Sequence, residues 1–323
     1  MATLNQRTCL TSLGNTGIQP CFLDPKFMSG GFLTPKGDEI DVTSLQTALS
    51  AKIYNANKAA RWYPFYFLEA PKISTEQKTI QTMATGQKHV VREGFNDWAF
   101  QYQSGGLSLH KNYRLFNGTN FDFVFFDNDA PNWNMLGITG SAATKLKAIP
   151  SDGGFFWADP WNPNDGSKIA EYMLQFVYAS KYVNDYISTV SGSFDIPSTL
   201  PGLIDVNLTA SATVNVTSGS FNICIVSPLG VDIGAKYSTA LAAIGAWTAA
   251  VATSGAALTL TGVVWVPSTT AGVPGYFTVT MATTTPYPGS GSVLINLAAS
   301  SVLAATPYGA AIESTGAVSI VRN

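Results

Sequence analysis

Apolar and polar residues alternate along most of the C-terminal part of the chain. Turn-forming clusters such as SPLG, TTAGVPG and TPYPGSG separate the alternating stretches. Those stretches, between residues 203 and 323, are LIDVNLTASATVNV, SFNICIVSP, AALTLTGVVWVPS, GYFTVTMAT, GSVLINLA and GAVSIVRN. Short strands at roughly 8–12-residue spacing are typical of a β-sandwich or barrel. Within this region, YSTALAAIGAWTAAV predicts a short helix before a strand, because alanine favours helices.

The N-terminal part mixes the helical period with the strand period. Leu45, Leu49 and Ile53 recur every four residues, which predicts a helix with Asp41 or Thr43 as its N-cap. A second short helix is expected in LSLHKNYRLFNG, where Leu109, Tyr113 and Phe116 share a face and Gly118 ends the helix. The fold class predicted for this part is therefore an α+β sandwich or barrel with one or two helices.

Aromatic strands make up the rest of the N-terminal part. RWYPFYFLEA predicts a strand that Pro64 restricts to a sheet edge. HVVREGFNDWAFQYQ predicts two strands around a turn at Glu93-Gly94, with Trp98, Phe100 and Tyr102 on one inward face. FDFVFFDNDAPNWNMLGIT predicts a strand, a turn and a return strand, and GGFFWADPW a further strand. EYMLQFVYASKYVNDYI alternates at the strand period.

A change in charge usage divides the chain. Only two basic and three acidic residues follow Ile196, and the segment SGSFDIPSTLPG has two prolines and two glycines. We therefore predict a β-rich assembly domain at 1–190, whose residues 1–40 form an N-terminal arm. A linker at 191–202 and a β-sandwich at 203–323 follow.

Charged residues are only 12% of the chain, whereas hydrophobic residues are 46% and the net charge is −2. Typical soluble domains have roughly 25% charged residues, so this composition suits a subunit whose surface is covered in an assembly. It also lacks the basic patch that tight nucleic-acid binding needs. No signal peptide and no transmembrane helix is predicted. Cys9, Cys21 and Cys224 are expected to be reduced thiols, with a Cys9–Cys21 disulfide as the alternative.

The cluster His89, Arg92 and Glu93 is the first candidate for chemistry. In a strand, His89 faces one way and Arg92 the other, and Glu93 then begins a turn. The spacing does not gather the three groups for acid–base catalysis, so we interpret them as solvated charges. His110, beside Lys111 on the second helix, receives the same interpretation.

The acidic candidates are Asp127, Asp129, Asp159 and Asp165. Asp127 and Asp129 fit an Asx-rich turn. DPWNPNDGSKIAE resembles a calcium loop, but Trp161 stands where an EF-hand places its first carboxylate five residues before Gly166. The Gly-Gly pairs at 30–31, 105–106 and 153–154 lack a phosphate-loop context and indicate turns and bulges. We therefore assign no catalytic, cofactor-binding or metal-binding residue, expect no cofactor, and expect the chain not to be an enzyme.

The C-terminal part resembles bacterial immunoglobulin-like modules. The resemblance lies in Tyr237, Ala240-Leu241 and Trp247, followed by SGAALTLTGVVW and GYFTVTM. They are similar to an aromatic-anchored strand, a turn and a hairpin partner. The Cys…Trp…Cys spacing of antibody domains is not present.

Three N-terminal stretches resemble structural proteins of tailed bacteriophages, in particular the major tail tube protein. They are LGNTGIQPCFLDPKFMSGGFLTPKGDEI, ATGQKHVVREGFNDWAFQYQ and LHKNYRLFNGTNFDFVFFDND. The resemblance lies in the order of elements, so no single residue inherits a role. It implies hexameric rings around a channel, an inner β-barrel shared by six subunits, and ring stacking through an arm at 1–40 and a loop within 70–95. Lys88, His89 and Arg92 would then lie at a loop or ring-to-ring contact.

This resemblance predicts a virion protein, assembled in the host bacterial cytoplasm. Its partners would be copies of itself, other tail proteins and DNA in transit, without a membrane partner. If the C-terminal part is a separate domain, a flexible, non-contractile tail is favoured, because a contractile sheath would leave little room for it. The alternatives are another phage head, neck, baseplate or decoration protein, or a carbohydrate-binding or adhesin module. The dense aromatic stretches motivate the last alternative, although aromatic residues at strand period more often form a core or a subunit interface.

Overall fold

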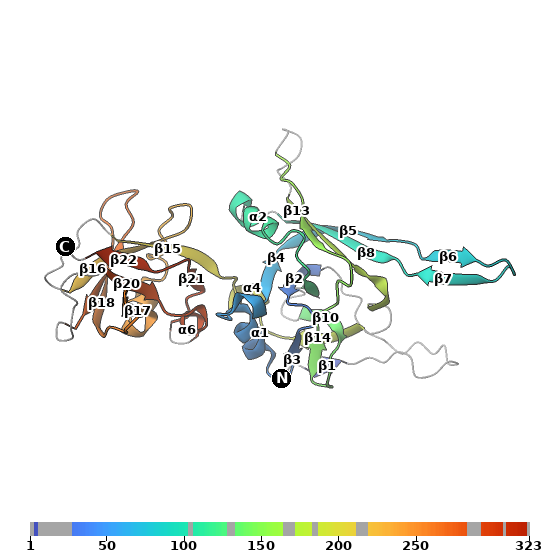
Figure 1. Ribbon diagram of the computed structural model, residues 1–323, viewed down its shortest axis with the longest axis horizontal. Helices are drawn as coiled ribbons and strands as arrows, with labels where there is room; N and C mark the ends of the chain where they lie inside the picture. Colours follow the sequence, from blue (N-terminus) through green and yellow to red (C-terminus); the bar gives the residue numbers. More distant parts are fainter. Residues whose placement is uncertain are drawn as a thin grey trace. The chain divides into compact units, whose positions relative to one another are not determined.

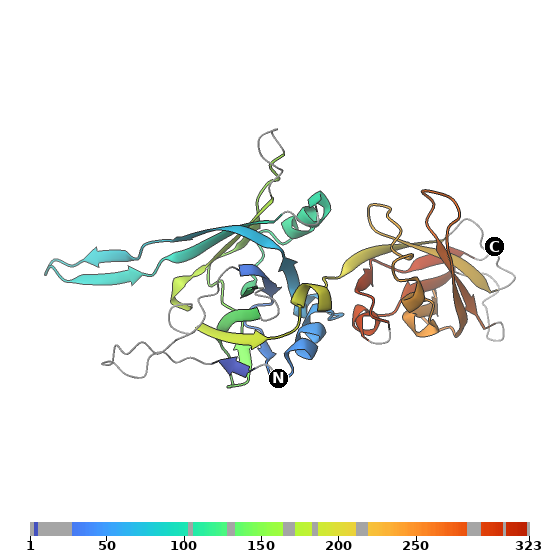
Figure 2. The same cartoon turned by 180° about the vertical axis from the view of Figure 1, so that it is seen from behind.

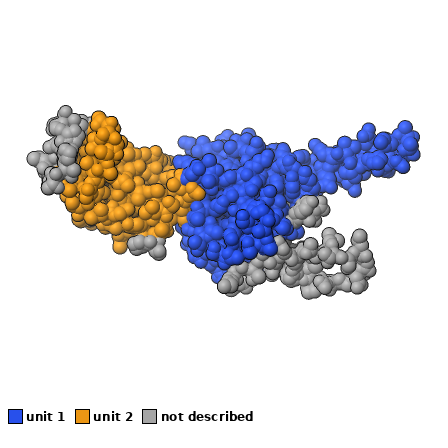
Figure 3. All heavy atoms as spheres, turned by 60° about the horizontal axis from the view of Figure 1, so that its bottom comes forward, with its two compact units in different colours: residues 1–53, 57–201 blue, residues 54–56, 202–323 orange. Residues whose placement is uncertain are grey.

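The computed structural model describes residues 3–5, 28–102, 106–127, 133–163, 172–182, 187–210, 219–282, 292–305 and 308–321. The chain is mainly β, as predicted (Figure 1). It divides into two compact units, shown in different colours in Figure 3. Unit 1 comprises residues 1–53 and 57–201, and unit 2 comprises residues 54–56 and 202–323.

Unit 1 is built from two antiparallel sheets and a short two-stranded ribbon. One sheet has the order β1-β14-β10-β9-β2-β4, with β11 paired to β10 and β3 paired to β11. The other sheet has the order β12-β13-β8-β5. The elements are β1 (Thr3–Asn5), β2 (Met28–Thr34), β3 (Glu39–Asp41), α1 (Leu45–Ile53), η1 (Lys58–Ala60), β4 (Tyr63–Tyr66), β5 (Leu68–Thr75), β6 (Thr79–Thr82), β7 (Lys88–Arg92), β8 (Phe95–Tyr102), α2 (Gly106–Arg114), β9 (Asp122–Asp127), β10 (Trp133–Thr139), β11 (Lys145–Lys147), β12 (Phe156–Ala158), β13 (Tyr172–Ala179), β14 (Ile187–Gly192) and α4 (Ile196–Thr199).

The two sheets of unit 1 pack face to face through aromatic side chains. Phe65 and Phe125 of the larger sheet meet Phe176 of the smaller sheet, with ring centroids 4.8 Å and 5.3 Å apart. Strand β13 alternates between buried and half-buried residues along its whole length, as its sequence predicts. The inward prediction for β8 is also confirmed, since Phe100 and Tyr102 are buried and Trp98 packs against Phe125.

Both predicted helices are present. In α1, Leu45, Leu49 and Ile53 are buried on one face. The helix is tied to the body by Lys52, whose Nζ lies 2.6 Å from the carboxylate of Asp38. Helix α2 ends at Arg114, four residues before the predicted stop, and a turn then leads to Gly118, whose φ is +75°. Strand β4, which contains Pro64, lies at a sheet edge as predicted.

The predicted turn at Glu93-Gly94 is wrong. Strand β7 pairs with β6, whereas β8 pairs with β5 and β13. The two halves of the sequence stretch therefore continue along one side of a long hairpin, and the chain reverses at residues 83–87 instead (Figures 1 and 2). Gly86 has a φ of +81° in this reversal.

The segments predicted as an arm and as a linker both contribute to the folded body of unit 1. Within the predicted arm at 1–40, strand β2 lies inside the larger sheet between β9 and β4, and its Phe32 is fully buried. Residues 6–27 of that arm lie outside the described residues. Within the predicted linker at 191–202, Ser191 belongs to β14 and pairs with Asn134, and Asp195 caps helix α4. The division between the units falls instead at residues 201–202.

Unit 2 is a second β-sandwich, with sheets in the orders β18-β19-β16-β15-β21 and β17-β20-β22. Phe221, Ile223 and Phe277 of one sheet and Trp247 and Ile295 of the other form one core. The short helix predicted before Trp247 is present as α5. The elements of unit 2 are β15 (Ile204–Ala210), β16 (Ser220–Val226), α5 (Ser238–Leu241), η2 (Ile244–Ala246), β17 (Trp247–Val251), β18 (Leu260–Val266), β19 (Tyr276–Met281), β20 (Ser292–Leu297), α6 (Ser300–Ala304), β21 (Ile312–Ser314) and β22 (Val318–Val321). Strands β15 and β21 pair in parallel, and the immunoglobulin-like relationship stays a prediction.

Phe125 is the central contact between the sheets of unit 1. Its ring meets Phe65, Trp98, Phe100 and Phe176. We expect Phe125→Ala to lower the free energy of unfolding of unit 1 by about 3–5 kcal/mol, because it leaves a cavity in a close-packed core. Chemical denaturation followed by near-ultraviolet circular dichroism measures this change. Leu115→Ala, at a side chain that is 75% exposed, serves as the control and should change it by less than about 0.5 kcal/mol.

Candidate assembly surface

A two-stranded ribbon projects from the smaller sheet of unit 1 (Figure 1). It consists of β6, β7 and the reversal at 83–87, and it extends β5 and β8 away from the sandwich (Figure 2). Every residue from 72 to 93 is exposed. Ribbon and sandwich therefore belong to one hairpin, of which only the root is covered by a second layer.

The ribbon presents apolar side chains to solvent. Ile80 and Val90 are directly paired across the two strands, and each is about half exposed. Met83 lies at the reversal and Val91 is the extra residue of a β-bulge, and both are also exposed. Exposed apolar groups gathered on one element mark surfaces that bind another protein. No described element covers these two strands, and an isolated two-stranded hairpin is at best marginally stable in water.

The root of the hairpin is tightly packed at Gly94. A Cβ atom added there would lie 1.8 Å from the backbone oxygen of Glu76. The carbonyl of Gly94 accepts hydrogen bonds from the backbone N–H and the hydroxyl of Ser180, at 3.2 Å and 2.8 Å. Beside it, Arg92 forms an exposed ion pair with Glu76 and stacks over Phe95. Gly94 thus permits the close approach of the two hairpin strands, and its carbonyl is held by Ser180, directly after β13.

We expect Gly94→Ala to loosen this root, because the new methyl group displaces the backbone of Glu76. The free energy of unfolding of unit 1 should fall by about 1–3 kcal/mol. The N–H groups of Glu76 and Ser180, hydrogen-bonded in the wild type, should exchange faster with solvent. Gly316→Ala is the matched control, since its Cβ would meet no atom within 4 Å. If the N–H groups of Glu76 and Ser180 exchanged at the wild-type rate in Gly94→Ala, the close packing assigned to Gly94 would be contradicted.

The structure does not bring His89, Arg92 and Glu93 together. His89 lies exposed on β7 opposite Gln81, whereas Arg92 is engaged with Glu76. Among the described residues, no hydrogen bond or ion pair joins the three. They belong to the surface of the ribbon and its root, as the alternation along the strand indicates.

The prediction that His110 is solvated is wrong. His110 is only 1% exposed, and its Nδ1 lies 2.7 Å from the hydroxyl of Tyr102. Its Nε2 is buried and forms no hydrogen bond with the described residues. Burial lowers the pKa of His110, and the charge of Arg114 acts in the same direction, while Asp159 opposes both. The helical pattern alone does not reveal this burial, because Tyr102 and Tyr172 come from other elements.

Unit 1 should therefore lose stability on mild acidification. The unfolded chain binds a proton at His110 near pH 6.5, while the folded chain binds it only at a lower pH. The free energy of unfolding should be level above about pH 6.5 and fall as the pH decreases toward the lowered pKa. Thermal melts between about pH 7.5 and 5.5 measure this, above the range where most carboxylates titrate. We expect His110→Gln to flatten the dependence and His89→Gln, at an exposed position, to leave it intact.

The acidic candidates have structural positions. Asp127 is buried at the end of β9, where it accepts a hydrogen bond of 2.6 Å from the backbone N–H of Asn134, as an Asx-type anchor does. Asp159 follows β12 and is half-buried. Asp129 and Asp165 lie outside the described residues. In the part of the chain that the structure describes, no group of three or more His, Cys, Asp or Glu could hold a metal ion.

The glycine pairs lie in a strand, a turn and the start of a helix, and the one described cysteine is buried. Gly30 and Gly31 lie in β2 beside a β-bulge, and Gly153 has a φ of +92° in a turn. Gly106 begins α2, and its neighbour Gly105 lies outside the described residues. Cys224 is a buried free thiol, and burial raises its pKa. Cys9, Cys21 and their alternative disulfide lie outside the described residues.

No family model, no curated protein and no solved structure matches this chain. Among the helices described, none is long and apolar enough to cross a membrane.

Proposed function

We propose that this chain is a self-assembling structural subunit, and specifically the tail tube protein of a tailed bacteriophage. The observation that carries the proposal is the ribbon, with Ile80 and Val90 paired and exposed on two strands that no other described segment covers. A second copy of the chain would supply that layer. Burying apolar surface contributes roughly 25 cal/mol per Å² removed from water, so such a contact favours assembly.

The two edges of the smaller sheet differ, and this difference favours contact with another copy of the chain at only one of them. At β12, the side-chain amide of Asn117 donates to the carbonyl of Ala158 at 3.0 Å and accepts from its N–H at 2.7 Å. The outer edge of β12 is therefore blocked at this residue. At the other edge, residues 72–75 of β5 are exposed and continue into the ribbon. Strand addition is thus favoured on the β5 side, and two different surfaces in contact produce rings or open fibres.

The finer features of the proposal come from the resemblance to tail tube proteins. These features are six-fold rings, their stacking, a shared inner barrel and the passage of genomic DNA. A net charge of −2 is compatible with a channel that does not retain phosphates. The virion tail is the location that this function implies, with assembly in the host bacterial cytoplasm. Other tail proteins would be its neighbours at the ends of the tube.

The double variant Ile80→Asp with Val90→Asp tests the role of the ribbon. Two carboxylates in place of the paired apolar side chains should abolish assembly, because burying them unpaired is strongly unfavourable. Sedimentation velocity and negative-stain microscopy at rising concentration should show rings or tubes for the wild type and only monomers for the variant. Circular dichroism should show both proteins folded, since the two side chains lie outside the core.

Val264→Asp is the control, because Val264 is an exposed valine on a strand of unit 2, with an exposed fraction of 60% against 52% for Val90. It should assemble like the wild type. A wild-type protein that stays monomeric at every concentration would contradict the proposed function. Normal assembly of the double variant would contradict the role of the ribbon.

A further inference from the structure

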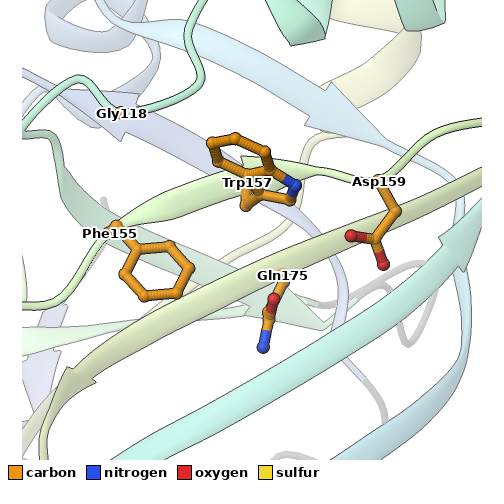
Figure 4. Close-up of a pocket in the computed structure, with 5 residues that line it drawn as sticks. All are labelled: Gly118, Phe155, Trp157, Asp159 and Gln175. Carbon is orange, nitrogen blue, oxygen red and sulfur yellow. The ribbon is translucent and has the colours of Figure 1, made fainter.

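A pocket opens on the smaller sheet of unit 1, away from the ribbon. Its cavity volume is about 460 Å³, and Gly118, Phe155, Trp157, Asp159 and Gln175 line it (Figure 4). Cavities of this size accommodate small molecules of a few rings. The aromatic core of the sandwich lies on the opposite face of the same sheet, so the pocket is not a defect of the core.

The strand period places the pocket residues on one face. Phe155, Trp157 and Asp159 occupy every second position, and the backbone N–H groups of Phe155 and Asp159 both donate to carbonyl groups of β13, at 3.0 Å. The pairing of β12 with β13 therefore extends one residue beyond each end of β12, to Phe155 and to Asp159. On the neighbouring strand, Gln175 pairs directly with Trp157. Figure 4 shows the two rings and the carboxylate arranged around Gln175.

The polar groups around the pocket are held before any ligand arrives. Asn117 fixes both backbone groups of Ala158, which lies between Trp157 and Asp159. The amide nitrogen of Gln175 donates to both carboxylate oxygens of Asp97, at 2.9 Å and 2.8 Å. This engagement leaves the carbonyl oxygen of Gln175 as the group that can accept from a ligand. Preorganised contacts lose less entropy when a ligand binds.

The chemistry of the lining selects a class of ligand. Phe155 and Trp157 are 40% and 41% exposed and offer flat apolar faces, while Asp159 and Gln175 offer oxygen acceptors. A purely apolar ligand would desolvate the Asp159 carboxylate without a partner. A phosphate or another anion would be repelled by Asp159 and Asp97. A ligand with an apolar face and several hydroxyl donors satisfies both kinds of group.

We propose that this pocket binds a neutral saccharide unit. One C–H face of the ring stacks on Trp157, with Phe155 extending the apolar wall. Hydroxyl groups at the edge of the sugar donate to the carboxylate of Asp159 and to the carbonyl of Gln175. This binding activity is additional to the proposed assembly function, uses none of the residues of the ribbon, and does not depend on it.

Titration calorimetry of the full chain with neutral oligosaccharides tests the proposal. The ligands are tetrasaccharides of glucose, galactose, mannose and N-acetylglucosamine, together with a tetra-uronate as the anionic counterpart. We expect at least one neutral sugar to bind, and the tetra-uronate to bind more weakly than that sugar. Trp157→Ala and Asp159→Asn should each weaken the neutral sugar about tenfold or more. Pull-down with bacterial surface polysaccharide containing that sugar then distinguishes a polymer-borne ligand from a free one.

Trp161→Ala is the matched control, because Trp161 is 42% exposed and only four residues away but does not line the pocket. It should bind the sugar as the wild type does. No binding to any neutral tetrasaccharide would overturn the proposal, as would equal loss in Trp161→Ala and Trp157→Ala. Binding of n-butylammonium but not sugars, weakened by salt, would instead identify a cation site and overturn the saccharide assignment. Assembly is measured separately in the same preparations, so failure of one proposal is distinguishable from failure of the other.

Discussion

The face-to-face packing of two sheets through Phe65, Phe125 and Phe176 determines most of the architecture of unit 1. Because side chains alternate along a strand, directing Leu174 and Phe176 into this core turns Gln175 to the opposite face. The pocket is therefore a consequence of the same register that fills the core. Beyond the edge of the sandwich the hairpin continues without a second sheet, and the alternation then leaves apolar residues on both strands in water.

The strand and helix periods predict much of the fold. The buried face of α1, the alternation of β13 and the inward face of β8 are all readable in the sequence, since each depends on a local period. The pairing of strands, by contrast, depends on residues that are far apart in the sequence. Glu93-Gly94 has the composition of a turn, yet glycine is needed there for close packing against Glu76. Nothing within a few residues of Gly94 distinguishes these two uses.

The candidate site residues, too, are predicted correctly only where their environment depends on neighbouring positions in the sequence. The alternation of His89 and Arg92 correctly separates them, whereas the burial of His110 depends on Tyr102 and on contacts that no short window contains. The pocket was also not predicted. Its residues Phe155, Trp157 and Asp159 stand in the sequence at strand spacing, but their exposure follows from pairing with Gln175, which is distant in the chain. A surface aromatic and a core aromatic have the same local signature.

The central claim is that contact between copies covers the ribbon, and amide hydrogen exchange at different protein concentrations tests it most directly. In the unassembled chain, the amides of residues 77–92 should exchange rapidly, because the two strands are exposed and lack a third strand. In assembled particles, we expect roughly tenfold or greater slowing at these residues, with little change in the buried strand β13. Rings or tubes that form while exchange in 77–92 stays fast would contradict the claim.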